Sequence, residues 1–187
     1  LPLYFLVTDD WKLEDIRVMN TTVKKWSMED YVHSYKSLEK TIAGPYTTLE
    51  WYRKTYGLSL ESSVNILHNK GKMSGKGVIE DFKKGKLKIQ DLNWAKSFGG
   101  FLLKIKPFWS QYNKRAFVHA LLHLDQDHKF SRKVFLERMD RHSMKMRKCT
   151  NVIDYFELLE YIFNCGTRTK IQFDRKEKWI QGYKPLR

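Results

Sequence analysis

The chain has 187 residues, 42% of them hydrophobic and 30% charged, and its 35 lysines and arginines exceed its 21 aspartates and glutamates to give a formal net charge of +14. This apolar content can bury one substantial core, which excludes a disordered chain, and no apolar run approaches the roughly 20 residues of a membrane span. The charge favours a polyanion such as nucleic acid over a membrane surface, because cationic surfaces attract phosphates and bind them by releasing counterions.

The first forty residues predict one strand and two helices. Residues 1–10 read as a strand, since they are too short for a secretion signal and lack its basic start. Apolar residues at helical spacing predict a helix over residues 11–20. The sequence from Ser27 to Asp30 is typical of a capping box and predicts a helix that runs to about Lys40.

Residues 59–88 are typical of a helix-turn-helix unit. A helix over residues 47–56 should end at Gly57, which tolerates the left-handed conformation, and Ser59 should cap the next helix, to about residue 68. After a turn rich in glycine and lysine, a short helix should bury Val78, Ile79 and Phe82 and turn its lysines outward. A second helix of this kind would face phosphates.

Four helices are predicted in the remainder. They cover residues 91–105, 111–125, 131–141 and 151–164, and the second is apolar nearly all round, which indicates a buried central helix. Gly99 and Gly100 should bend the first or let another backbone approach it. Residues 170–174 alternate like a strand or an extended tail. The predicted fold is mainly α: a multi-helix bundle with a helix-turn-helix-like unit, one N-terminal strand and a short extended C-terminal tail.

The candidate binding site is a strip of lysines on this unit. We expect the first group to grip nucleic-acid phosphates and the second to extend the same strip: Lys70, Lys72 and Lys76, then Lys83, Lys84, Lys86 and Lys88. No arginine, asparagine or glutamine clearly projects from the second helix, so base readout is unassigned and binding should be largely independent of sequence. Double-stranded DNA is the expected partner.

Histidines and cysteines offer weaker candidates for chemistry. His119 and His123 have the spacing of a zinc-protease motif, but the intervening residues supply no glutamate as base, so a structural role is favoured even with His128, Asp125 and Asp127 nearby. The glycine-rich turn at residues 74–77 lacks the spacing of a nucleotide loop. The sequence therefore predicts no metal site, no cofactor and no catalytic residue.

The two cysteines and the tryptophans are the remaining candidates for reactive or base-stacking side chains. Two cysteines, Cys149 and Cys165, are too few for a metal cluster or disulfide framework and indicate a reducing cytosol; Cys149 lacks an orienting group for catalysis. Trp51 and Trp94 should lie on the apolar faces of their helices. Trp179, among basic residues, is the better candidate for an exposed stacking platform.

The order of these segments resembles phage-type proteins of the ParB/sulfiredoxin superfamily. The resemblance covers nearly the whole chain and rests on segments 1–10, 13–16, 20–21, 25–31, 56–59, 82–87, 115–122 and 155–160, such as Lys25-Trp26-Ser27-Met28-Glu29-Asp30-Tyr31 and Phe82-Lys83-Lys84-Gly85-Lys86-Leu87. It implies that residues 1–10 are the last strand of a ParB-like N-terminal fold. A helical domain with the DNA-binding helix-turn-helix would follow at 11–106, then a helical subdomain and basic tail at 107–187.

The family's motif for nucleotide or nuclease chemistry, of the Asp-Gly-Gln-His-Arg or Gly-Glu-Arg-Arg type, would precede Leu1, so no enzymatic activity carries over to these residues. The resemblance implies a DNA-binding protein of a phage or mobile element, acting in the cytoplasm of a bacterial host. Two alternatives remain: an interaction protein or inhibitor that binds a host protein, and the remnant of a ParB-like nuclease or nucleotide hydrolase.

Overall fold

The computed structural model describes residues 26–39, 44–69 and 77–174, without the side chain of Asn69. The described residues form eight α-helices and one short 3-10 helix, joined by turns and irregular segments, and contain no strand. This confirms the mainly α class. None of these helices is both long and apolar enough to cross a membrane. Several predicted features lie outside the described residues: the strand at 1–10, the helix at 11–20, residues 74–76 of the glycine-rich turn, Trp179 and the site lysines Lys70, Lys72 and Lys76.

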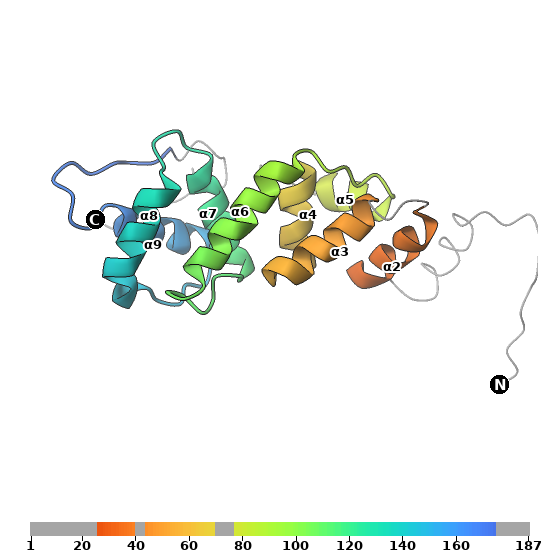
Figure 1. Cartoon of the computed structure of the whole chain (residues 1–187), viewed down its shortest axis with the longest axis horizontal. Coiled ribbons are helices and arrows are strands. Elements are labelled where there is room, and N and C mark those ends of the chain that lie inside the picture. Colours follow the sequence, from red (N-terminus) through yellow and green to blue (C-terminus); the bar gives the residue numbers. More distant parts are fainter. Residues whose placement is uncertain (1–25, 40–43, 70–76, 175–187) are drawn as a thin grey trace, which may run out of the picture.

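The helices form an elongated array with α6 in the middle (Figure 1). Toward one end lie α2 (Met28–Leu38), α3 (Pro45–Tyr56), α4 (Leu60–Asn69) and α5 (Gly77–Lys83), and α6 spans Leu92–Ile105. Toward the other lie α7 (Arg115–Asp125), α8 (Arg132–His142), the 3-10 helix η1 (Ser143–Lys145) and α9 (Val152–Phe163). Helix α6 packs against α3 and α4 toward one end and against α8 toward the other, so it joins the two ends.

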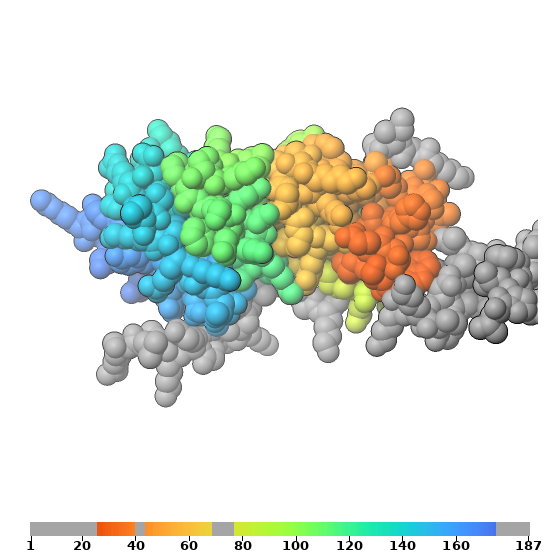
Figure 2. All heavy atoms as spheres, turned by 90° about the horizontal axis from the view of Figure 1, so that it is seen from below, coloured from red at the N-terminus to blue at the C-terminus, as the bar shows by residue number. Residues whose placement is uncertain are grey.

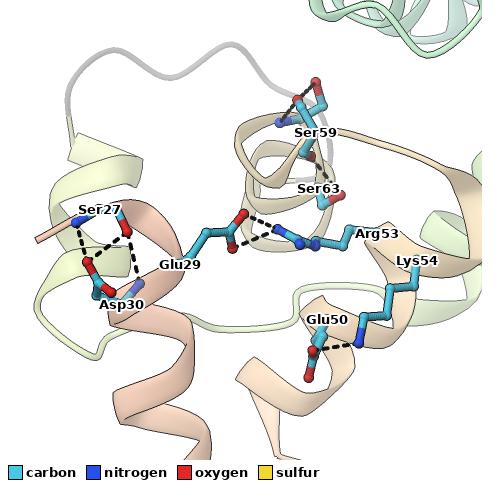
Figure 3. A network of polar contacts seen from close by, with 9 residues as sticks. Ser27, Glu29, Asp30, Glu50, Arg53, Lys54, Ser59 and Ser63 are labelled. Atoms are coloured by element: carbon cyan, nitrogen blue, oxygen red, sulfur yellow. Dashed lines mark hydrogen bonds and ion pairs between the residues drawn. The ribbon is translucent and has the colours of Figure 1, made fainter.

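The predicted helix boundaries in the first half follow from local capping. The Ser27 hydroxyl accepts the amide of Asp30 at 3.3 Å while the Asp30 carboxylate accepts the amide of Ser27 at 2.8 Å, which confirms the capping box (Figure 3). Gly57 ends α3 with φ +64°, and the Ser59 hydroxyl accepts the amide of Ser62 at 3.2 Å. Each cap satisfies backbone groups that a helix end leaves without partners.

Ion pairs tie α2 to α3 at the surface. Glu29 and Arg53 point toward one another in Figure 3, with both carboxylate oxygens within 2.7 Å of one guanidinium nitrogen. Glu50 accepts hydrogen bonds from Lys36 and Lys54, and these bonds lower the pKa of its carboxyl to about 2. Solvent-exposed pairs of this kind contribute about 0–1 kcal/mol each, so packing decides the arrangement of these helices.

A single cluster of buried side chains extends from Val32 on α2 to Phe173 near the end of the described chain. Its centre is α7, which is buried at every position from Phe117 to Leu122 and packs against α4 and α9, as predicted for a central helix. The helix begins at Arg115 instead of residue 111, because residues 111–114 form turns in which the Lys114 amide bonds to the Gln111 carbonyl at 3.0 Å.

The two glycines of α6 do not interrupt it, contrary to the prediction of a bend. A side chain at Gly99 would place its Cβ 2.6 Å from atoms of the Tyr56 ring, so an aromatic ring, and no second backbone, approaches this helix. Tyr56 thereby packs directly on the α6 backbone, and its hydroxyl donates to the Lys96 carbonyl at 3.3 Å. Close packing explains Gly99; it does not explain Gly100, around which a Cβ would meet nothing within 4 Å.

The segment after α9 is held without regular secondary structure. The Asn164 side chain accepts the amide of Ile171 at 2.7 Å and donates to its carbonyl at 2.8 Å, and the Glu160 carboxylate accepts the amide of Phe173 at 2.9 Å. Gly166, with φ +75°, turns the chain before it. Residues 170–174 form no strand, and Phe173 is buried against Phe163 and Phe130.

Candidate nucleic-acid interface

Four of the predicted site lysines lie together at the end of α5 and on the segment that follows it. Lys83, Lys84, Lys86 and Lys88 are all exposed, and we call this stretch the lysine turn. On the opposite side of α5, Val78 and Phe82 are buried. The predicted division between an apolar inner side and a lysine-bearing outer side is confirmed for these residues, whereas Ile79, also predicted to be buried, is only half-buried.

The backbone of the lysine turn has a fixed geometry. The Lys86 amide donates to the Asp81 carbonyl at 2.8 Å and the Gly85 amide to the Phe82 carbonyl at 3.2 Å, which is the pattern of a Schellman motif. Gly85 has φ +76°, and the Tyr35 ring occupies the space that a Cβ there would need. Glycine is thus required at this position by conformation and by space.

Two tyrosines from other helices hold the end of α5. The Tyr35 hydroxyl donates to the Lys83 carbonyl at 2.9 Å, and the Tyr46 hydroxyl donates to the Phe82 carbonyl at 2.6 Å. Their rings stack at 4.7 Å between centroids. The last carbonyls of a helix lack the amides of a following turn, so these hydroxyls add hydrogen bonds at the end of α5 and attach the lysine turn to α2 and α3.

His68, on the last turn of α4, anchors the far side of the lysine turn. Its Nδ1 accepts the Lys88 amide at 3.0 Å, so Nε2 carries the proton and faces the Asp81 carboxylate at 3.6 Å. The Gln90 amide donates to the Leu67 carbonyl at 2.9 Å. Residues 86–90 are therefore fixed to the end of α4, without pairing as a strand.

The lysine turn carries a local excess of positive charge. Among the described residues, no carboxylate forms an ion pair with any of its four lysines, and Asp81 is directed toward His68. The Lys83 ammonium lies 5.9 Å from the centroid of the Tyr31 ring. Positive charges near the C-terminal end of a helix stabilise it, because that end of the helix dipole is negative. These lysines therefore also contribute to the stability of α5.

The arrangement suits phosphate contacts better than base readout. The helix α5 has only seven residues, and its exposed side chains are those of Glu80 and Lys83. The helix α4 follows a three-residue turn containing Gly57, the spacing usual before a recognition helix, but it buries Val64, Ile66 and Leu67 and carries no lysine or arginine. Among the described side chains of the two helices, no arginine, asparagine or glutamine is exposed to make the bidentate contacts that distinguish bases.

The histidine cluster is a packing feature of α7. His119 is buried with its Nε2 3.5 Å from the Asn65 amide nitrogen, and burial lowers the pKa of both His119 and His123 to about 4. Asp125 is occupied by Arg132, which contacts both of its carboxylate oxygens at 2.5 Å. In the described part of the chain, no three histidine, cysteine or acidic side chains come together to hold a metal ion.

The surroundings of the two cysteines do not favour a nucleophile. Burial raises the pKa of the Cys149 thiol, whereas a nucleophilic thiol needs a lowered pKa, and Cys165 is buried.

The prediction that Trp51 belongs to the core is wrong. Trp51 is 42% exposed, and the Lys96 ammonium lies 5.3 Å from the centroid of its ring. Tyr52 and Tyr56 occupy the buried face of α3 instead. Trp94 is half-buried and stacks on Phe98 at 5.7 Å.

The residues that hold the lysine turn in place were not predicted from the sequence. Nothing in the sequence pattern singles out Tyr35, Tyr46 or His68 as partners of this segment. Comparison with family models, with curated proteins and with solved structures gave no match. The candidate function therefore rests on the chemistry of these residues.

Proposed function

We propose that the chain binds nucleic acid, most strongly double-stranded DNA, by placing the ammonium groups of the lysine turn against backbone phosphates. The observation that carries the proposal is the fixed backbone beneath those cations. The Tyr35 and Tyr46 hydroxyls hold two successive carbonyls of α5, and Gly85 admits no side chain. Lysines on a fixed turn lose less conformational freedom on binding than lysines on a flexible loop.

The net charge of +14 supports the same partner, since it attracts a polyanion over distances longer than a contact. The proposed unit is the helix-turn-helix-like region of a ParB-like protein, in which residues 59–88 form the DNA-binding part. Its short second helix makes it a phosphate-gripping element with little preference among sequences. Lys70, Lys72 and Lys76 belong to the same proposed strip.

The test is a fluorescence-anisotropy titration with duplex DNA, single-stranded DNA and RNA over a series of salt concentrations. Replacing Lys83, Lys84 and Lys86 with alanine should weaken duplex binding and reduce the slope of log K against log salt by roughly 0.9 for each phosphate that is no longer neutralised. The matched control replaces three exposed lysines elsewhere, Lys114, Lys148 and Lys170, which gives the same net charge.

The two variants separate a local site from a general charge effect. If both weaken binding equally, the cations act only through total charge and the lysine turn is not the site. If the unmodified chain binds none of the three nucleic acids, the proposed function itself is wrong. A duplex affinity that falls only in the lysine-turn variant supports the proposal.

A second candidate function, docking on a partner protein, is favoured by Trp51. A large aromatic side chain that is 42% exposed and flanked by polar residues is typical of the anchors on which binding energy concentrates. Trp51→Ala should then abolish a complex with a host protein that survives nuclease treatment, while duplex binding stays unchanged. Loss of duplex binding in this variant would assign Trp51 to the nucleic-acid surface instead.

A further inference from the structure

A groove of about 540 Å³ lies between α6 and α8, away from the lysine turn. The two helices run side by side in Figures 1 and 2. Its walls carry the Ser97 hydroxyl, the side chains of Phe101 and Leu136, and the charged groups of Lys104, Lys133 and Glu137, with Arg132 at one side. The groove is open to solvent and more basic than acidic.

Gly100 lies in this groove in the interior of α6. Glycine inside a helix is destabilising relative to alanine, so an interior glycine needs a reason. For Gly99 the reason is the Tyr56 ring, which leaves no room for a Cβ. A Cβ on Gly100 would meet nothing within 4 Å, so no contact inside the protein accounts for it. Because Gly100 has no side chain, a ligand can approach the backbone of α6 closely from the solvent side.

The cations around Gly100 differ in how much of their charge is available. Arg132 is balanced by Asp125, bonds to the Ser97 hydroxyl at 2.8 Å and lies over the Phe98 and Phe101 rings, so its role is to position the wall. Lys104 and Lys133 are exposed, and neither forms an ion pair with a described residue. Glu137 is the single acidic side chain in the lining. Two uncompensated ammonium groups beside a bare stretch of helix suit a phosphate.

We propose that this groove is a second phosphate-contact site, in which a nucleic-acid backbone passes close to Gly100 between Lys104 and Lys133. The inference rests on the proposed function, because the ligand is the same polyanion. It adds the groove between α6 and α8 to the contact surface that the lysine turn provides between α5 and α6.

The test compares two kinds of groove variant by anisotropy with the same duplex and single-stranded oligonucleotides. Gly100→Gln fills the space above the helix without changing charge, and Asn93→Gln, at an exposed position of α6 outside the groove, is its control. Lys104→Ala with Lys133→Ala removes the two cations, and Lys114→Ala with Lys148→Ala is the control of equal charge. Thermal unfolding without ligand monitors the fold of each.

Because nothing blocks a side chain at position 100, Gly100→Gln should keep the fold and raise the melting temperature by roughly 1–4 °C. It should nevertheless weaken binding, and the double lysine variant should weaken it on the order of tenfold and lower the salt slope by roughly 1.8. If both groove variants bind like the unmodified chain while the lysine-turn variant is weakened, the groove proposal is overturned and the proposed function stands. If neither the unmodified chain nor any variant binds an oligonucleotide, both fail together.

Discussion

The hydroxyl of Tyr46 donates a hydrogen bond of 2.6 Å to the backbone carbonyl of Phe82, a residue 36 positions further along the chain. The bond joins the first turn of α3 to the last turn of α5 and lies one residue before the first lysine of the lysine turn. The position of the lysine turn therefore depends on the packing of a different helix.

Tyr46→Phe tests this dependence, because it removes the hydroxyl and keeps the buried ring. The Phe82 carbonyl retains the Gly85 amide as a partner at 3.2 Å, so we expect a decrease of about 1 kcal/mol in the free energy of unfolding, measured with urea. Duplex affinity should fall although no charge has changed. Tyr161→Phe, at a position 52% exposed, is the control and should change stability by under about 0.5 kcal/mol. Unchanged affinity in Tyr46→Phe would show that the lysines bind without a fixed turn.

Gly85→Ala should be among the more damaging exchanges of a glycine in this chain. Its φ of +76° costs an alanine about 1–2 kcal/mol, and the Tyr35 ring must also move. Gly166→Ala is a matched control, since its φ is +75° and the atom nearest to a Cβ there is the end of the Arg138 side chain at 3.5 Å. Urea unfolding should show Gly85→Ala to be the worse of the two by about 1 kcal/mol or more. Equal destabilisation would mean that the Tyr35 ring yields without cost.

The stability of the fold should depend on pH through the two histidines of α7. Burial lowers the pKa of His119 and His123 from 6.5 to about 4, so between these values the unfolded chain binds more protons than the folded one. The free energy of unfolding should therefore fall as the pH is lowered from about 6.5 to about 4, by roughly 2–5 kcal/mol for the pair. Above pH 7 both histidines are neutral in either state and contribute no slope.

The variant His119→Gln with His123→Gln should flatten this part of the profile when unfolding is measured at pH 7, 5.5 and 4.5. Glu50, whose pKa is about 2, titrates in the folded chain below this range. A slope that persists in the double variant would assign the effect to other groups.

The pair formed by Arg132 and Asp125 should be coupled. The Asp125 side chain is 5% exposed, so Asp125→Asn leaves the Arg132 charge poorly balanced in a half-buried position, at an expected cost of about 2–4 kcal/mol. Arg132→Met together with Asp125→Leu should be less destabilising than the sum of Arg132→Met and Asp125→Leu measured singly, in a double-mutant cycle of thermal unfolding. Strict additivity would contradict a direct interaction.

Local rules explain which parts of the fold could be predicted from the sequence. The capping box at Ser27, the left-handed Gly57 and the buried face of α7 depend on neighbours within one or two turns, and all three were predicted correctly. The lysines at the end of α5 were predicted to be exposed for the same reason, since the apolar Val78 and Phe82 and the lysines that follow them lie within a short stretch of sequence.

Long-range contacts explain what could not be predicted. Whether Trp51 or Tyr52 enters the core depends on which side of α3 meets α4 and α6, and a helical wheel that is aromatic on both sides does not decide this. The bonds from Tyr35 to Lys83 and from Tyr46 to Phe82 cross 48 and 36 residues, and a tyrosine in an apolar stripe gives no signal that its hydroxyl has a distant partner.

The lysine turn separates the residues that fix its shape from those that set its charge. Gly85, Tyr35, Tyr46 and His68 hold the backbone, whereas the side chains of Lys84, Lys86 and Lys88 are exposed to solvent. Substitutions at these three lysines can therefore change the charge of this surface step by step while the contacts that hold the backbone stay in place. Such a surface can adapt to a new ligand quickly during evolution, or be redesigned in the laboratory, while its scaffold stays the same.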